Sequence, residues 1–133
     1  MRNKIPHVIV CDDDSELNSF IRNHFKLDGY ETHQALSAKE CIDKLAELGD
    51  TIDAITINGT IASDRSVMLI LNVRRLNKNV KVFVLADKGL SEDKVWMMEY
   101  GADVFWTKPI SMEPLINKAN LNLLEAARSA VAS

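Results

Sequence analysis

The sequence has few cysteines, no excess of positive charge and no long apolar run. Only two cysteines occur among 133 residues, Cys11 and Cys41, and their spacing matches neither a metal site nor a redox pair. The net charge of -3 argues against a nucleic-acid binder that works through bulk electrostatics. No apolar run reaches membrane length and no signal peptide is recognisable, so we expect a cytoplasmic protein with free thiols and no membrane contact.

The chain also lacks internal repeats and low-complexity linkers. Its composition, 47% hydrophobic and 26% charged, is that of one globular domain with a real core. We place this domain at residues 1–127 and treat residues 128–133 as a tail that is too short for another domain. The most basic segment, Arg74 and Arg75 with Lys78 and Lys81, is interpreted as a solvated helix end and loop.

Five short apolar runs alternate with five stretches of helical periodicity. The runs predict strands over residues 8–11, 30–35, 52–58, 80–85 and 103–107, and the helices are expected over residues 15–28, 37–48, 63–76, 91–100 and 111–127. The strands are too apolar and the helices too long for anything but a parallel sheet covered on both faces. We therefore predict an α/β fold with a doubly wound, five-stranded parallel sheet in a three-layer α/β/α arrangement.

The first helix carries a readable cap and a readable apolar stripe. Asp14 or Ser15 can cap it, because a short polar side chain accepts hydrogen bonds from the first free N–H groups. The residues expected to be buried on this helix are Leu17, Phe20, Ile21 and Phe25.

Polar residues follow the strands that should meet at one edge of this sheet. In a doubly wound sheet the carboxyl ends of the first, third, fourth and fifth strands surround a common crevice. The residues at those ends are Asp12, Asp13, Asn58, Ala86, Asp87 and Lys108. Adjacent carboxylates suit a hard cation such as Mg²⁺, and a lysine supplies a point charge for a phosphoryl oxygen. The alternative is that the acidic run only caps a helix and that Lys108 is solvated.

Four segments in this order carry a family resemblance. They are VIVCDDDS, DAITIN, VFVLAD and GADVFWTKPI. Over residues 5–127 the chain resembles the receiver domain of two-component response regulators. The resemblance implies a flavodoxin-like fold, a signalling function in a phosphorelay, and no enzyme of the ordinary kind. In such domains an aspartate at the end of the third strand accepts a phosphoryl group from a histidine kinase, with Mg²⁺ bound by acidic residues.

The resemblance assigns roles to several residues. It implies that Asp12 and Asp13 match the acidic pair, and that the carbonyl of Thr60 matches the backbone metal ligand. Lys108 matches the lysine that contacts the phosphoryl group. The bond between Lys108 and Pro109 matches one that is usually cis in the family, which is otherwise an uncommon geometry.

Three positions depart from the family pattern. Asn58 stands where the phosphoacceptor aspartate is expected, and an amide cannot form an acyl phosphate. Ala86 stands where a threonine or serine hydroxyl would bond the phosphoryl oxygen. Phe105 replaces the tyrosine that is commoner at the switch position, or matches the phenylalanine of some members, and it has no hydroxyl. The loss of both the acceptor and the hydroxyl at residues 58 and 86 predicts a degenerate receiver.

The missing carboxylate should also weaken the metal site. Two unit charges ~4 Å apart interact by roughly 4 kcal/mol at the effective dielectric of a protein surface. We therefore expect Mg²⁺ binding by Asp12, Asp13, Asn58 and Thr60 to be possible but weak, and we expect no organic cofactor. Asp87 could restore some charge or pair with Lys108, and the sequence leaves both open.

Two tryptophans indicate a surface for protein partners. Trp96 lies in an apolar run with Met97 and Met98, so part of that helix must face outward. Trp106 lies on the last expected strand. In the family, the helix at 91–101, the strand at 103–107 and the last helix form the usual docking and dimer surface, which implies a histidine kinase-type partner, a downstream effector or a homodimer.

Three functions are compared. The first is a receiver-like signalling module that acts by protein–protein contact without phosphorylation at Asn58. The second is an ordinary phosphorelay receiver whose acceptor arises by conversion of Asn58 to Asp. The third, a Mg²⁺-dependent phosphotransfer enzyme, needs a nucleophile that the crevice lacks.

Overall fold

The computed structural model describes residues 5–58, 63–86, 91–108 and 110–132, without the side chains of residues 63–65, 91–93 and 127–132. The strands are β1 (His7–Cys11), β2 (Glu31–Ala35), β3 (Ala54–Asn58), β4 (Lys81–Ala86) and β5 (Val104–Thr107). The helices are α1 (Ser15–Leu27), α2 (Ala38–Leu48), α3 (Ser63–Leu76), α4 (Ser91–Tyr100) and α5 (Met112–Ala132), with a short 3-10 turn, Gly49–Thr51, before β3.

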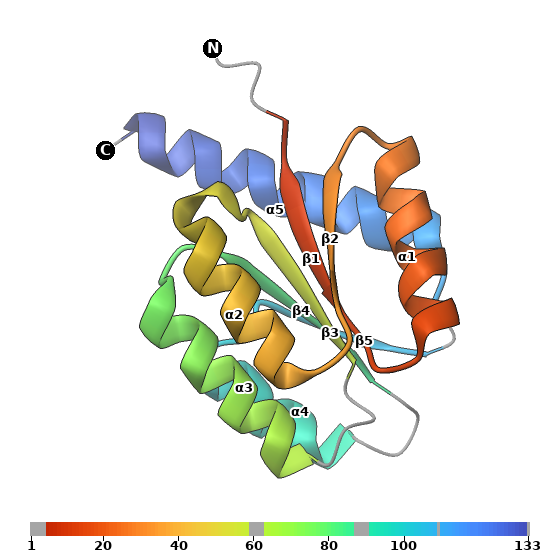
Figure 1. Ribbon diagram of the computed structural model, residues 1–133. Helices are drawn as coiled ribbons and strands as arrows, with labels where there is room; N and C mark the ends of the chain where they lie inside the picture. Colours follow the sequence, from red (N-terminus) through yellow and green to blue (C-terminus); the bar gives the residue numbers. More distant parts are fainter. Residues whose placement is uncertain (1–4, 59–62, 87–90, 109, 133) are drawn as a thin grey trace.

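The strands form one parallel sheet with the order β2-β1-β3-β4-β5. Each strand is followed by a helix, so the predicted doubly wound, flavodoxin-like α/β fold is confirmed (Figure 1). The order places β3 at the centre of the sheet with β1 and β4 beside it. All five residues of β3 are buried, as a strand covered on both faces requires.

Two apolar cores lie on opposite faces of the sheet. Ile9, Ile55 and Val84 face one core, which α2, α3 and α4 cover with Leu45, Ile70 and Met97, among others. Val8, Val10 and Phe83 face the other core, which α1 and α5 cover with Ile21, Phe25 and Leu115, among others. Successive strand residues point to opposite faces, so β1, β3, β4 and β5 supply both cores, whereas β2 contributes only Ala35, to the first.

Helix α1 departs from its expected stripe. Asp14 is the cap, since its Oδ1 accepts hydrogen bonds from the N–H groups of Glu16 (3.0 Å) and Leu17 (3.1 Å). Phe20, expected in the core, is 47% exposed and its ring packs against His24. Asn18 is fully buried in its place. Ile21 and Phe25 are buried as predicted, but the polar residue Asn18 also lies inside the buried stripe of the helix.

Helix α5 continues beyond its expected end at residue 127 and reaches Ala132. Residues 128–132 therefore extend the last helix and do not form a separate tail. No helix in the described ranges is both long and apolar enough to cross a membrane.

Candidate functional site

Asn58 lies at the carboxyl end of the central strand, beside the ends of β1 and β4. Asp12 follows β1 directly and is 2% exposed, and Asn58 is 5% exposed. Lys108 follows β5 and is half-buried, whereas Asp13 is exposed. The structure thus brings together three of the predicted site residues, Asp12, Asn58 and Lys108, and leaves Asp13 at the surface.

A chain of hydrogen bonds joins these three side chains. The Asn58 amide donates from Nδ2 to Oδ1 of Asp12 over 2.9 Å. Lys108 donates from Nζ to Oδ1 of Asn58 over 3.1 Å. Oδ1 of Asp12 also accepts the backbone N–H of Asp14 at 2.9 Å. The asparagine therefore bridges a carboxylate and an ammonium group, using its donor toward the first and its acceptor toward the second.

The partners fix the orientation of the Asn58 amide. If the oxygen and nitrogen exchanged places, the amide oxygen would face the Asp12 carboxylate and the NH₂ group would face the Lys108 ammonium. Both contacts would then be repulsive, because carboxylates only accept and ammonium groups only donate hydrogen bonds. The present arrangement is the one that this carboxylate and this lysine permit.

This arrangement does not fit a magnesium ion in the position that the family resemblance implies. Mg²⁺ takes oxygen ligands in near-octahedral geometry. Here Asn58 presents an N–H donor to Asp12, and its only side-chain oxygen faces Lys108. Within the described ranges, no group of three or more His, Cys, Asp or Glu side chains is placed to hold a metal ion.

The other substituted positions lie close by but offer no polar side chain. Ala86 is fully buried at the end of β4, and its carbonyl accepts the backbone N–H of Lys108 at 2.7 Å. Phe105 is half-buried and packs against the core under α2, α3 and α4. Thr60, Asp87 and Pro109 lie outside the described residues, so the metal carbonyl, the extra carboxylate and the cis bond remain expectations.

Asn18 is a buried residue that supports the candidate site and that the sequence does not predict. Its Nδ2 lies within hydrogen-bond distance of the carbonyls of Val10 (3.0 Å), Asp12 (3.1 Å) and Ala35 (3.1 Å). Its Oδ1 accepts a bond of 2.7 Å from Nε of Arg22. The side chain therefore holds the segment that carries Asp12 against the end of β2. An amide at a core-facing position of α1, three residues before Ile21, was the signal.

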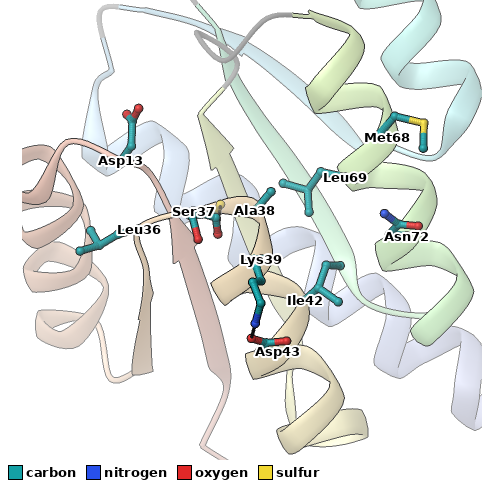
Figure 2. Close-up of a pocket in the computed structure, with 11 residues that line it drawn as sticks. Asp13, Leu36, Ser37, Ala38, Lys39, Ile42, Asp43, Met68, Leu69 and Asn72 are labelled. Atoms are coloured by element: carbon teal, nitrogen blue, oxygen red, sulfur yellow. Dashed lines mark hydrogen bonds and ion pairs between the residues drawn. The ribbon is translucent and has the colours of Figure 1, made fainter.

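A cavity of about 570 Å³ lies beside this edge, between α2 and α3 (Figure 2). Asp13 is at its rim, and apolar side chains such as Ile42 and Leu69 line it from the two helices. Cys11 also lines it, and its thiol donates to the carbonyl of Ser37 at 3.7 Å. The hydrogen bond with Cys11 and burial both raise the pKa of the Cys41 thiol well above its usual value. Both cysteines are free, as expected, and both are buried.

The two tryptophans do not share one face of the sheet. Trp96 is 54% exposed on α4 and stacks on Tyr100, with ring centroids 6.1 Å apart. Met97, the next residue, is buried in the core that α2, α3 and α4 cover. Trp106 packs against the opposite core, under α1 and α5. Trp96 and Trp106 thus lie on the two sides of the edge strand β5, and their shared role in a docking surface stays a prediction.

Comparison with known proteins decides the family. The model of the response regulator receiver domain matches residues 8–120 of this chain. The chain belongs to the receiver domain family. Receiver domains act in two-component signalling, where they interact with histidine kinases or effectors, and they are not classical enzymes. Receiver domains typically bind Mg²⁺ for phosphorylation.

Two receiver structures and one curated protein illustrate the similarity. A CheY-like receiver domain protein from Methanospirillum hungatei JF-1 superposes with a TM-score of 0.85 at 19% identity, over 94% of this chain and 98% of that chain. The receiver domain of the Francisella response regulator 1452 gives a TM-score of 0.78 at 29% identity, over 90% and 98%. The transcriptional regulatory protein PrrA of Mycobacterium leprae (strain TN) is 27% identical over 128 residues, 96% of this chain and 54% of that protein. This receiver domain spans about half the length of the curated relatives it matches.

Proposed function

We propose that this domain is a degenerate receiver, which regulates a protein partner by contact and does not accept a phosphoryl group at residue 58. The observation that carries the proposal is the hydrogen-bonded bridge from Asp12 through Asn58 to Lys108. In an ordinary receiver, residue 58 would be a nucleophilic carboxylate, a cation would lie between it and Asp12, and the lysine would be at position 108. Here the amide supplies a donor in the direction of the cation and has no nucleophilic oxygen to offer to phosphorus.

The same bridge supports a constitutive state of the crevice. Asp12 and Asn58 are almost completely buried, and a buried polar group that loses its partner costs about 1–3 kcal/mol. Any ligand that separates the two side chains must offset that cost. Ala86 also brings no hydroxyl with which a bound phosphoryl group could be sensed. We therefore expect the domain to hold one conformation whether or not Mg²⁺ and a phosphodonor are present, and to bind Mg²⁺ weakly at most.

A phosphodonor experiment tests this function. The protein is incubated with acetyl phosphate and Mg²⁺, and its intact mass is measured. We expect no stable gain of about 80 daltons, roughly the mass of one phosphoryl group. The matched control is Asn58→Asp, which supplies the missing carboxylate and should gain that mass.

The alternative receiver function predicts a different outcome. If the unmodified chain gains a phosphoryl group that peptide mapping places in the crevice, the degenerate assignment is wrong. If the gain occurs only in the fraction of chains in which residue 58 has become aspartate, the domain is an ordinary receiver that requires this conversion. A cytoplasmic location remains part of the proposal, because it rests on the family and on cysteine usage.

We place the partner contact on α4. Its exposed apolar side chains are Val95 (66%), Trp96 (54%), Met98 (39%) and Tyr100 (38%). Water-exposed apolar groups that cluster on one element favour association, because contact removes them from water. This surface lies beside the β5 edge of the sheet, where the family resemblance also places its docking surface.

We propose that the partner bound at this surface of α4 is a second copy of the chain. Sedimentation velocity over a concentration series should show self-association that Trp96→Ala weakens. Phe20→Ala is the control, since Phe20 is a comparably exposed aromatic residue on α1 at 47%. A monomer at all concentrations would reject the homodimer and leave a kinase or effector as the partner to test on the same variants.

A further inference from the structure

Two histidines form a close pair on the side of the sheet remote from the crevice. Nδ1 of His7 and Nε2 of His33 are 3.0 Å apart. The two rings are stacked, with centroids 5.3 Å apart and planes inclined by 13°. His7 begins β1 and His33 lies in the middle of β2. Both residues are half-buried, so each keeps part of its surface in contact with solvent.

The strand register explains why these rings meet. His7 is directly opposite Glu31, and His33 is two residues further along β2. Residues two apart on a strand share a face, so His7, Glu31 and His33 all project from one face of the sheet edge. The backbone N–H of His7 donates to Oδ2 of Asp53 over 2.9 Å, which holds the start of β1 in place. The pair therefore rests on two hydrogen-bonded strands and not on loops.

The electrostatic surroundings keep the second ring neutral. Burial, the nearby His7 and then Lys44 lower the pKa of His33, while Glu31 and Glu47 act in the opposite direction with smaller effect. A neutral imidazole has a lone pair on one ring nitrogen, and a protonated one has none. The neutral His33 ring therefore has a lone pair to offer to an electron-pair acceptor, and His7 Nδ1 lies beside it.

We propose that His7 and His33 form a two-histidine binding site for a divalent transition ion such as Ni²⁺ or Cu²⁺. Two nitrogens that each lie about 2.05 Å from one ion at a right angle are about 2.9 Å apart, close to the observed 3.0 Å. Imidazole nitrogen is a preferred ligand of these ions, whereas Mg²⁺ prefers oxygen. Water molecules would complete the coordination.

Binding requires a tautomer change and no net loss of protons. In the hydrogen-bonded pair, one of the two facing nitrogens carries a hydrogen. That hydrogen must be replaced by one on the other nitrogen of the same ring, so that both facing nitrogens present lone pairs to the ion. The ion then replaces the N–H···N hydrogen bond as the link between β1 and β2. A site of this kind binds only when both imidazoles are neutral, so its affinity falls as the pH is lowered.

The test is a calorimetric titration with Ni²⁺ at pH 7.5, in the presence of excess Mg²⁺. We expect one site per chain that excess Mg²⁺ does not block. His7→Gln and His33→Gln should each weaken binding by about tenfold or more, since each removes one of two protein ligands. His24→Gln is the control, because His24 is a half-buried residue of α1, away from the pair, and this variant should bind as the unmodified chain does.

A spectroscopic measurement locates the bound ion, which the affinity alone does not. Ni²⁺ is paramagnetic, so substoichiometric amounts should broaden the NMR signals of residues around His7 and His33 before those around Asn58. Circular dichroism of each variant shows whether it is folded, and the NMR experiment on the unmodified chain needs no variant. Binding weaker than about 1 mM, equal affinity in all variants, or broadening centred on another site would overturn the proposal.

Discussion

The side chain of Asn58 gains its importance from the two groups that it separates. A carboxylate at residue 58 would face the Asp12 carboxylate at the distance where Nδ2 now donates, 2.9 Å. It would also pair with Lys108, now 3.1 Å from Oδ1 of Asn58. The repulsion between the two carboxylates would then oppose the attraction of residue 58 to Lys108. A divalent cation bound between the two carboxylates would remove that repulsion. The amide makes the cation unnecessary, because its N–H group donates a hydrogen bond to Asp12 where the cation would otherwise lie.

Asn58→Asp should make the stability of the fold dependent on Mg²⁺. The variant acquires two facing carboxylates, and an ion that binds only the folded state stabilises it by mass action. At a Mg²⁺ concentration ten times the dissociation constant, the gain is about 1.4 kcal/mol in the free energy of unfolding. Thermal denaturation with and without Mg²⁺ measures it.

Two controls accompany this measurement. Asn117→Asp makes the same charge change at an exposed position of α5 and should respond to Mg²⁺ as the unmodified chain does. Ca²⁺-free and EDTA-treated samples define the baseline. An equal Mg²⁺ response in all three proteins would contradict the account of the bridge.

A second substitution should be needed for switching. In Asn58→Asp, a phosphoryl group can be attached, but the buried Ala86 has no hydroxyl to bond its oxygen. Asn58→Asp with Ala86→Thr should therefore show a change in Trp96 fluorescence on phosphorylation that the single variant lacks. If the single variant shows the full change, the hydroxyl is not required in this chain.

At the residue scale, the sequence predicts which side chains meet but not how they bond. The meeting of Asp12, Asn58 and Lys108 follows from three strand ends at one sheet edge. The direction of the amide depends on distances of a few tenths of an ångström, which no pattern of residue types carries. The role of Asn18 was missed because its partners are carbonyls, which every residue has.

At the element scale, Arg74 joins α3 to the segments around β4 and β5. Its guanidinium donates to the carbonyls of Val80 and Gly101 and forms an ion pair with Asp103 at 2.7 Å. Gly101 has a φ of +132°, and a Cβ there would lie 2.8 Å from Cγ of Arg74. The interpretation of Arg74 as solvated was wrong, because charge runs do not reveal which member turns inward. Its neighbour Arg75 is indeed exposed.

Arg74→Ala should lower the free energy of unfolding by about 2–3 kcal/mol. The substitution removes the ion pair and leaves part-buried carbonyls without their donor. Urea denaturation monitored by circular dichroism provides the measurement. Arg75→Ala, one residue along the same helix, should change stability by no more than about 0.5 kcal/mol. Similar losses in both variants would show that the effect is one of helix propensity.

Helix boundaries were predicted unevenly, for identifiable reasons. The ends of α1 and α2 have polar caps and glycines, and these lie within a residue or two of their expected positions. Helix α5 has no such stop after residue 127, and alanine-rich sequence continues the helix to Ala132. Helix α4 buries Met97 and exposes both its neighbours, Trp96 and Met98, so its apolar residues follow no helical stripe.

At the scale of the whole molecule, the alternation of strands and helices was sufficient to predict the fold class. Right-handed crossovers restrict a parallel sheet of this kind to few strand orders. The observed order, β2-β1-β3-β4-β5, is one of them. The contact that holds α5 against the residues between α1 and β2 could not be predicted. It depends on Tyr30 and Asn120, which are far apart in the sequence.

Tyr30 makes the stability of the molecule sensitive to alkaline pH. Its hydroxyl donates to Oδ1 of Asn120 on α5 over 2.6 Å. Burial, with smaller effects of Asp28 and Asp53, raises the pKa of Tyr30 from 10.0 to about 12. Because the folded state keeps the phenol proton longer than the unfolded state, this contribution is present below pH 10 and lost as the pH rises toward 12.

Tyr30→Phe isolates this effect. Between pH 10 and 12 the unmodified chain should lose stability more steeply than the variant, in chemical denaturation at matched pH values. Tyr100→Phe is the control, since Tyr100 is 38% exposed and lies on α4. Parallel pH curves for the unmodified chain and Tyr30→Phe would contradict the assignment.

The contact between Tyr30 and Asn120 also has a kinetic consequence. It closes a loop of 90 residues, whereas Asn18 meets its carbonyl partners within 17 residues along the chain. Long loops lose more entropy on closure, so local contacts tend to be present in the folding transition state before distant ones. A group that engages only after that barrier affects the rate of unfolding and leaves the rate of folding unchanged. Asn120→Ala should accordingly raise the unfolding limb of a chevron plot and leave the folding limb unchanged. The contact of the last helix with Tyr30 would then prolong the lifetime of the native state.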